Sequence, residues 1–99
     1  MKNKKFTFLI PCYNSENFIY QNSIKLIKKI KKTKISYNLV FINDASSDST
    51  LQELKKIKTK FKNISIISYK KNLGKSAALQ IGLKKCKTNI VVFYDCDLP

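Results

Sequence analysis

The chain contains no histidine, arginine or tryptophan, and it has only two glycines, two prolines and three cysteines among 99 residues. With no histidine and no C-x-x-C pair, the cysteines at positions 12, 86 and 96 lack the pattern of a structural zinc site, and their odd number argues against a disulfide framework. No stretch approaches the length of a transmembrane helix, and the first residues lead to Pro11 rather than to the apolar segment of a signal peptide. We therefore expect a cytoplasmic chain.

Acidic residues are also scarce, with six against 20 lysines, so the formal net charge is +14. Basic surfaces attract phosphates, but proteins that read nucleic acid usually rely on the planar guanidinium of arginine, which is absent here. Lysine, isoleucine and asparagine supply 42 of the 99 residues, the composition that an A/T-rich coding sequence produces. We therefore interpret most of the lysines as solvated surface residues and expect no nucleic-acid partner. An attraction of this basic surface to anionic lipid is still expected.

Apolar residues make up 43% of the chain, which is enough for the core of one small domain. Short apolar runs alternate with segments whose apolar residues recur at helical spacing. Ser15 is the expected N-cap of the first helix, and the second is expected to begin within the polar cluster 43–48. The pattern predicts strands at 6–10, 37–42, 64–68 and 90–94, and helices at 16–32, along the apolar stripe of 51–61, and at 75–86.

This βαβαβαβ order predicts an α/β fold of the Rossmann-like kind, because right-handed crossovers give a parallel sheet with helices on both faces. Ligands bind such sheets at the carboxyl ends of the strands. Four of the six acidic residues fall in the loops expected at that edge, although the helices offer far more surface. These four are Asp44, Asp48, Asp95 and Asp97.

Asp95 and Asp97 follow the fourth predicted strand, and an extended backbone directs residues two apart to the same side. Carboxylate oxygens without soft ligands suit Mg²⁺ or Mn²⁺, ions that bridge protein oxygens to a diphosphate. A D-x-D pattern also occurs where two acids merely end a strand and cap a turn. The position at the end of the fourth strand favours the metal site.

Three further residues in these loops have both a ligand-binding and a structural interpretation. Asp44 can accept hydrogen bonds from the N–H edge of uracil or guanine, or it can cap a helix, a task for which Asp48 is better placed. Tyr13 offers a ring on which a base can stack, or it packs on the protein. Lys75, at a helix start, meets a phosphate or is simply solvated.

Gly74-Lys75-Ser76 resembles the end of a P-loop, but Tyr69 stands where that loop needs a glycine. A P-loop NTPase is therefore disfavoured. Gly82, inside the third predicted helix, lowers helix propensity and indicates close packing of the helix on the sheet.

Four segments in order resemble the N-terminal half of family 2 glycosyltransferases, which have the GT-A fold. Residues 8–14, Phe-Leu-Ile-Pro-Cys-Tyr-Asn, resemble the opening strand and P-x-Y-N turn, and residues 41–50 resemble the V-D-D-G-S-x-D-x-T segment. Residues 72–82 resemble the N-x-G-x-x-x-A-x-x-x-G helix. Residues 91–98 resemble the strand and D-A-D-L metal motif. The resemblance covers nearly the whole chain and is closest to the polyprenyl-phosphate (dolichol-phosphate) mannosyl- and glucosyltransferase branch.

The resemblance implies a nucleotide-sugar site. Pro11 and Tyr13 would contact the base, Asp44 would accept from its N–H edge, and Lys75 would face a phosphate. Asp95 and Asp97 would hold the diphosphate and a divalent metal, Mg²⁺ or Mn²⁺, with Asp97 as the principal ligand.

The sequence departs from the family pattern at several of these positions. Asn43 and Ala45 replace an aspartate and a glycine of the second segment. Ser15 stands where the polyprenyl-phosphate branch usually has a glutamate, with Glu16 one place later, and Pro99 stands where that branch often has a glutamine metal ligand. The changes at 15 and 99 bear on guanine specificity and on the metal coordination.

The resemblance implies an inverting, metal-dependent glycosyltransferase that moves a sugar from a UDP- or GDP-linked donor to an acceptor, with a polyprenyl phosphate as one candidate. It also implies that residues 1–99 are a single partial domain, because the acceptor half and its catalytic residues lie further along in that family. The 99-residue fragment by itself is expected to be inactive. A non-catalytic nucleotide-binding module and, last, a basic nucleic-acid-binding domain remain as alternatives, and membrane association at the cytoplasmic face would follow from a lipid acceptor.

Overall fold

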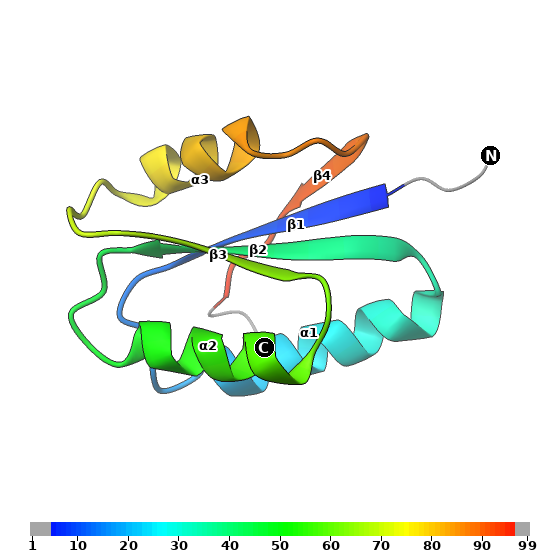
Figure 1. Ribbon diagram of the computed structural model, residues 1–99, viewed down its shortest axis with the longest axis horizontal. Helices are drawn as coiled ribbons and strands as arrows, with labels where there is room; N and C mark the ends of the chain where they lie inside the picture. Colours follow the sequence, from blue (N-terminus) through cyan, green and yellow to red (C-terminus); the bar gives the residue numbers. More distant parts are fainter. Residues whose placement is uncertain (1–4, 97–99) are drawn as a thin grey trace.

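The computed structural model describes residues 5–96, which form a single parallel sheet with helices on both faces (Figure 1). The element order alternates strictly between strand and helix, as the sequence predicts. The elements are β1 (Lys5–Cys12), α1 (Ile19–Thr33), β2 (Ser36–Asp44), α2 (Thr50–Lys60), β3 (Ile64–Tyr69), α3 (Lys75–Lys84) and β4 (Ile90–Phe93).

The sheet has the strand order β3-β2-β1-β4, and all three pairings are parallel. Strands β2 and β3 are added on one side of β1 and β4 on the other, so the strand order reverses at β1. In open α/β sheets the crevice at such a reversal, at the carboxyl ends of the strands, is where ligands bind. The predicted fold class is confirmed, and the topology places the binding edge after Cys12 and Phe93.

Each face of the sheet buries its own apolar cluster. On one face, α1 and α2 pack against the side chains of Phe8, Ile10 and Phe41. On the other face, α3 packs Ala78 against Leu9 and Ile42, and Figure 1 shows α3 alone on that side. The alternation of Leu9 and Ile10 between the two clusters follows the two-residue period of a strand.

Gly82 lies where α3 approaches the sheet most closely. A Cβ atom at this position would lie 2.9 Å from Ile42 Cδ1 and 3.2 Å from Leu9 Cδ2. The predicted structural role of Gly82 is therefore confirmed, because a side chain here would collide with the second apolar cluster.

Two predicted helix starts are wrong in position. Helix α1 begins at Ile19 rather than at Glu16, and Ser15 is not its N-cap. The Ser15 carbonyl instead accepts hydrogen bonds from the N–H groups of Phe18 (3.1 Å) and Ile19 (2.9 Å), which closes a turn before the helix. Helix α2 begins at Thr50, past the polar cluster 43–48, whose first two residues still belong to β2 and pair with β3 up to Tyr69.

In the described part of the chain, no helix has the length and apolar character needed to cross a bilayer.

Candidate functional site

A pocket of about 190 Å³ opens at the carboxyl ends of β1, β2 and β4. It brings together all five of the sequence-predicted site residues that the structure describes. These are Pro11, Tyr13, Asp44, Lys75 and Asp95. Asp97, the sixth, lies outside the described residues. Four segments separated widely in the sequence thus converge on one cavity.

Hydrogen bonds tie the loop after β1, which carries Tyr13, to the loop after β2. The Asn14 N–H donates to Ser46 Oγ (3.0 Å), and Asn14 Oδ1 accepts from the Ser47 N–H (2.8 Å). The buried Ser15 N–H donates to Thr50 Oγ1 (2.7 Å). These bonds fix the backbone on both sides of Tyr13, whose side chain remains 52% exposed at the pocket.

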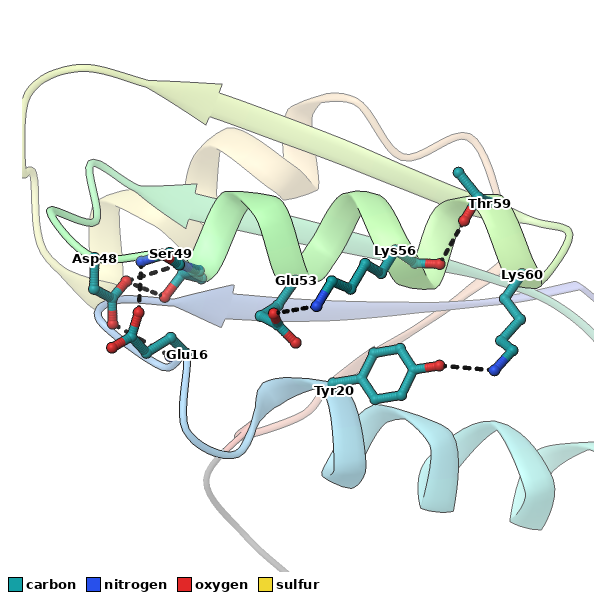
Figure 2. Close-up of polar contacts among 9 residues, drawn as sticks. Glu16, Tyr20, Asp48, Ser49, Glu53, Lys56, Thr59 and Lys60 are labelled. Carbon is teal, nitrogen blue, oxygen red and sulfur yellow. Dashed lines mark hydrogen bonds and ion pairs between the residues drawn. The ribbon is translucent and has the colours of Figure 1, made fainter.

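Two carboxylates at the start of α2 strengthen the same connection, as Figure 2 shows. Glu16 Oε1 accepts from the Ser49 N–H (2.8 Å), and Asp48 Oδ1 accepts from the Thr50 N–H (2.9 Å). Asp48 Oδ2 also accepts from the Glu16 N–H (3.2 Å). Anionic side chains satisfy the open N–H groups of a helix start, so the capping role predicted for Asp48 is confirmed. Glu16 performs a structural task here and does not line the pocket.

Asp44 is buried at the end of β2, and its carboxylate organises the loop that leads into α3. Oδ1 accepts from the Leu73 N–H (2.8 Å), and Oδ2 accepts from the Gly74 N–H (2.8 Å) and from Asn72 Nδ2 (3.0 Å). A carboxylate offers about four acceptor positions, so one position, on Oδ1, is left by these three bonds. Asp44 therefore holds the start of α3 in place, and it also lines the pocket.

Tyr69 lies behind Asp44 at the end of β3. Burial, reinforced by the neighbouring Asp44 carboxylate, raises the pKa of the Tyr69 hydroxyl well above its usual range. The hydroxyl is buried and has no hydrogen-bond partner among residues 5–96. The Tyr69 side chain therefore lies uncharged beside the Asp44 carboxylate at neutral pH.

Lys75 and Asp95 form an ion pair at the mouth of the pocket, with 3.0 Å between Lys75 Nζ and Asp95 Oδ2. The side chains are 61% and 38% exposed, so solvent screens the attraction and the pair contributes little to stability. Lys75 is the first residue of α3, whose open N–H groups and dipole favour an anion. The mouth of the pocket thus combines a cation with a carboxylate.

Among the described residues, the opening of the pocket offers only part of the ligand set that a hard divalent cation prefers. Asp95 supplies carboxylate oxygen, the ligand that Mg²⁺ and Mn²⁺ prefer. Residues 5–96 contain no group of three or more acidic, histidine or cysteine side chains arranged to hold a metal.

Sequence reasoning missed three residues of the pocket wall, namely Cys12, Phe18 and Cys96. Ser15, which also lines the pocket, was considered only as an N-cap and as a departure from the family's glutamate. Sequence reasoning also assigned no role to Asn72, whose side chain donates to both the carboxylate and the carbonyl oxygen of Asp44. The signal for Asn72 was its place in the polar loop before α3. Cys12 and Cys96 occupy the positions between predicted site residues, and nothing in their own chemistry marked them.

A protein-family model described as "Glycosyl transferase family 2" matches residues 7–98 of the chain. Among curated proteins, Bacillus subtilis CsbB is 33% identical over 98 residues, which cover 99% of this chain and 30% of that protein. The undecaprenyl-phosphate 4-deoxy-4-formamido-L-arabinose transferase of Proteus mirabilis is 29% identical over 98 residues, covering 98% of this chain and 30% of that protein. The chain thus spans under a third of the length of these relatives.

Solved structures match the same fold. Staphylococcus aureus TarS in complex with UDP-GlcNAc is 32% identical, with a TM-score of 0.81 over 94% of this chain and 26% of that one. The mannosyltransferase PcManGT of Pyrobaculum calidifontis, in complex with GDP-Man and Mn²⁺, has a TM-score of 0.83 over 98% of this chain and 28% of that one. Its 20% identity makes this second likeness one of fold.

Proposed function

Because the chain belongs to glycosyl transferase family 2, we propose that it forms the nucleotide-sugar-binding part of an inverting glycosyltransferase. The observation that carries the proposal is the pocket at the topological switch of the sheet, where Tyr13, Asp44, Lys75 and Asp95 meet. These side chains offer, in one cavity, an aromatic face, a hydrogen-bond acceptor, a cation and a metal-ligating oxygen. That is the set of groups a nucleoside diphosphate requires.

The base is proposed to bind between Pro11 and Tyr13, with the exposed ring of Tyr13 stacking on it. The remaining acceptor position on Asp44 Oδ1 then takes the N–H of the base. Because the Leu73 and Gly74 N–H groups already hold the carboxylate, it is oriented before the ligand arrives. Preorientation lowers the entropy that binding must overcome.

The diphosphate is proposed to lie at the start of α3. Lys75 is exposed enough to move its ammonium from Asp95 to a phosphate oxygen, and the open N–H groups of the helix face the same region. Asp95 and Asp97 would hold Mg²⁺ or Mn²⁺, which when bound offsets the negative charge of the departing nucleotide diphosphate.

The acceptor is proposed to be a polyprenyl phosphate. Support comes from the Gly-Lys-Ser-Ala-Ala and Asp-Cys-Asp-Leu segments of the sequence and from the name of the Proteus mirabilis relative. A phosphate acceptor is already ionised, so it needs no general base for attack. The high positive charge favours peripheral binding to an anionic membrane, where such an acceptor resides.

Calorimetry with UDP in the presence of Mn²⁺ tests the donor site, and GDP serves as the competing ligand. UDP comes first because the TarS structure, at 32% identity, contains UDP-GlcNAc. We expect Asp95→Asn to weaken binding at least about tenfold, equivalent to about 1.4 kcal/mol. Glu53→Gln is the matched control, since Glu53 is an acid of α2 that pairs with Lys56 away from the pocket. Equal affinity of the two variants would refute the assignment of Asp95.

Transfer is tested on the complete protein with a labelled donor sugar and undecaprenyl phosphate in vesicles of anionic lipid. A lipid-linked product that disappears in Asp97→Asn is the expected result. UDP binding without transfer to any offered acceptor would instead support a nucleotide-binding module.

A further inference from the structure

Cys12 and Cys96 lie close together where β1 and β4 end. In the β1–β4 ladder, Phe6 pairs with Ile90 and Leu9 pairs with Phe93, and the Tyr94 N–H still donates to the Leu9 carbonyl (2.9 Å). Cys96 then lies in a turn, where its carbonyl accepts from Asn22 Nδ2 of α1 (3.0 Å). Its side chain is directed back to β1, because Cys96 Sγ lies 3.3 Å from the carbonyl oxygen of Pro11, the residue before Cys12.

The two side chains also point to the same side. Both belong to the apolar cluster that α1 and α2 cover, and both contribute to the wall of the pocket. The Cys96 thiol beside it, together with burial, raises the pKa of the Cys12 thiol. Cys12 Sγ donates to the Ile10 carbonyl (3.4 Å), and Cys96 Sγ donates to the Pro11 carbonyl (3.3 Å). The third cysteine, Cys86, lies apart from them at the end of α3, on the opposite face of the sheet.

We propose that Cys12 and Cys96 are an oxidisable thiol pair that forms a disulfide across the floor of the pocket. The structure holds both in the thiol form. A hydroperoxide is the oxidant, and the pocket is its route to sulfur atoms that are otherwise buried. Cys96 is the more exposed of the two, at 6% against 1%, and reacts first.

The chemistry proceeds in two balanced steps. The Cys96 sulfur attacks the peroxide, which converts the thiol to a sulfenic acid and releases one water molecule from hydrogen peroxide. The Cys12 sulfur then attacks the sulfenic sulfur, forming the S–S bond and releasing the hydroxyl with the Cys12 proton as a second water. The two thiols lose two electrons in total, and the peroxide is reduced to water.

The pair joins the two segments that carry the proposed donor site. Cys12 stands between Pro11 and Tyr13, and Cys96 follows Asp95. This part of the inference rests on the proposed function. If a nucleotide occupies the pocket, it blocks the route of the oxidant, so bound UDP with Mn²⁺ is expected to slow disulfide formation.

Peptide mapping after treatment of the protein with hydrogen peroxide tests the pair directly. Cleavage after lysine separates Cys12 into residues 6–25, Cys86 into residues 86–87, and Cys96 into a peptide that begins at Thr88. We expect a non-reduced species that joins the Cys12 and Cys96 peptides, with the loss of two titratable thiols per chain. Both peptides recovered separately, with each cysteine alkylated or over-oxidised, would overturn the proposal, as would a bridge to Cys86.

Single-cysteine variants supply the controls. Cys86→Ala should leave the bridge and its rate unchanged, whereas Cys12→Ala should abolish it and leave Cys96 as the sulfenic acid, detectable with dimedone. A third measurement follows the rate with UDP and Mn²⁺ present at a concentration that calorimetry shows to be saturating. An unchanged rate with the ligand bound would refute the pocket as the route, whereas a failure of UDP to bind is a failure of the proposed function and leaves the mapping result to decide the pair.

Discussion

Ala45 adopts a left-handed backbone conformation, with φ at +57°, in the turn between β2 and α2. For residues with a Cβ atom this conformation costs about 1–2 kcal/mol, whereas glycine adopts it freely. The family pattern has glycine at this place. Ala45 thus retains the turn at a cost in stability, compensated by the Asn14, Ser46 and Ser47 hydrogen bonds around it.

We expect Ala45→Gly to stabilise the protein by about 1 kcal/mol, because relief of the strain exceeds the entropy that glycine adds to the unfolded chain. For a domain of this size that raises Tm by about 4–8 °C. Ala77→Gly in α3 is the matched control: it adds the same entropy at a helical position and should cost about 1 kcal/mol. Thermal unfolding of the unmodified protein and the two variants should show a higher Tm for Ala45→Gly and a lower Tm for Ala77→Gly. A lower Tm in both variants would refute the strain at Ala45.

Asp48 makes stability depend on acid pH. Burial raises the pKa of its carboxyl, but hydrogen bonds from Thr50 and from the Glu16 N–H outweigh burial, so the net pKa is lowered below the usual 3.8. A carboxyl with a lowered folded-state pKa contributes stability that is complete above its unfolded pKa and is lost as the pH falls through the folded value. Thermal melts between pH 6 and pH 2.5 should therefore show a smaller acid-induced drop for Asp48→Asn than for the unmodified protein. Parallel curves would contradict this.

At the scale of elements, the closest contact is that of α3 with the sheet through Gly82. Gly82→Ala brings a methyl group to 2.9 Å from Ile42 Cδ1 in a buried position. The overpacking costs about 1–3 kcal/mol, and the gain in helix propensity returns about 1 kcal/mol. We expect a net loss of about 1 kcal/mol in chemical denaturation.

Ile42→Val supplies the test of the cause, since it removes the Cδ1 atom that the new methyl group would meet. In a double-mutant cycle, the cost of Gly82→Ala should become smaller in the Ile42→Val background. Strict additivity would show that the loss has another origin.

The elements show why part of the site could be predicted from the sequence. The alternation of apolar strands with amphipathic helices predicts the sheet, and a parallel sheet brings the strand ends together, so the sequence predicts that Tyr13, Asp44 and Asp95 lie at one edge. The structure places all three in one pocket. The start of α1 was not found, because the Ser15 N–H is bonded to Thr50 Oγ1, 35 residues away, and no local pattern reports such a bond. The same holds for Asn72, whose partner Asp44 lies 28 residues earlier.

The whole molecule carries a large excess of positive charge, with six acidic residues and a net charge of +14. A lysine that links α1 with α2 also has a neutral partner: Lys60 Nζ donates to the Tyr20 hydroxyl (3.0 Å), as Figure 2 shows. Repulsion between lysines opposes the compact state more than the expanded one.

Added salt is therefore expected to stabilise the protein. From about 20 mM to about 300 mM NaCl the screening length falls from about 20 Å to about 6 Å, so Tm should rise. Reversing the charge of the exposed Lys28 and Lys29 in α1 should raise Tm at low salt and flatten this dependence. A Tm that falls with NaCl would show that attractive ion pairs dominate instead.

The strand order also has a consequence for synthesis on the ribosome. Of the four described strands, β1 is made before the others, yet one of its edges pairs with β4, which is made last of the four. After β2 has formed, roughly 50 further residues must be added before β4 is complete, which takes about 3–10 s at ordinary elongation rates. During that interval the nascent chain exposes the N–H and C=O groups along one side of an apolar strand, so a binder of extended peptides, such as a chaperone, has its best opportunity there.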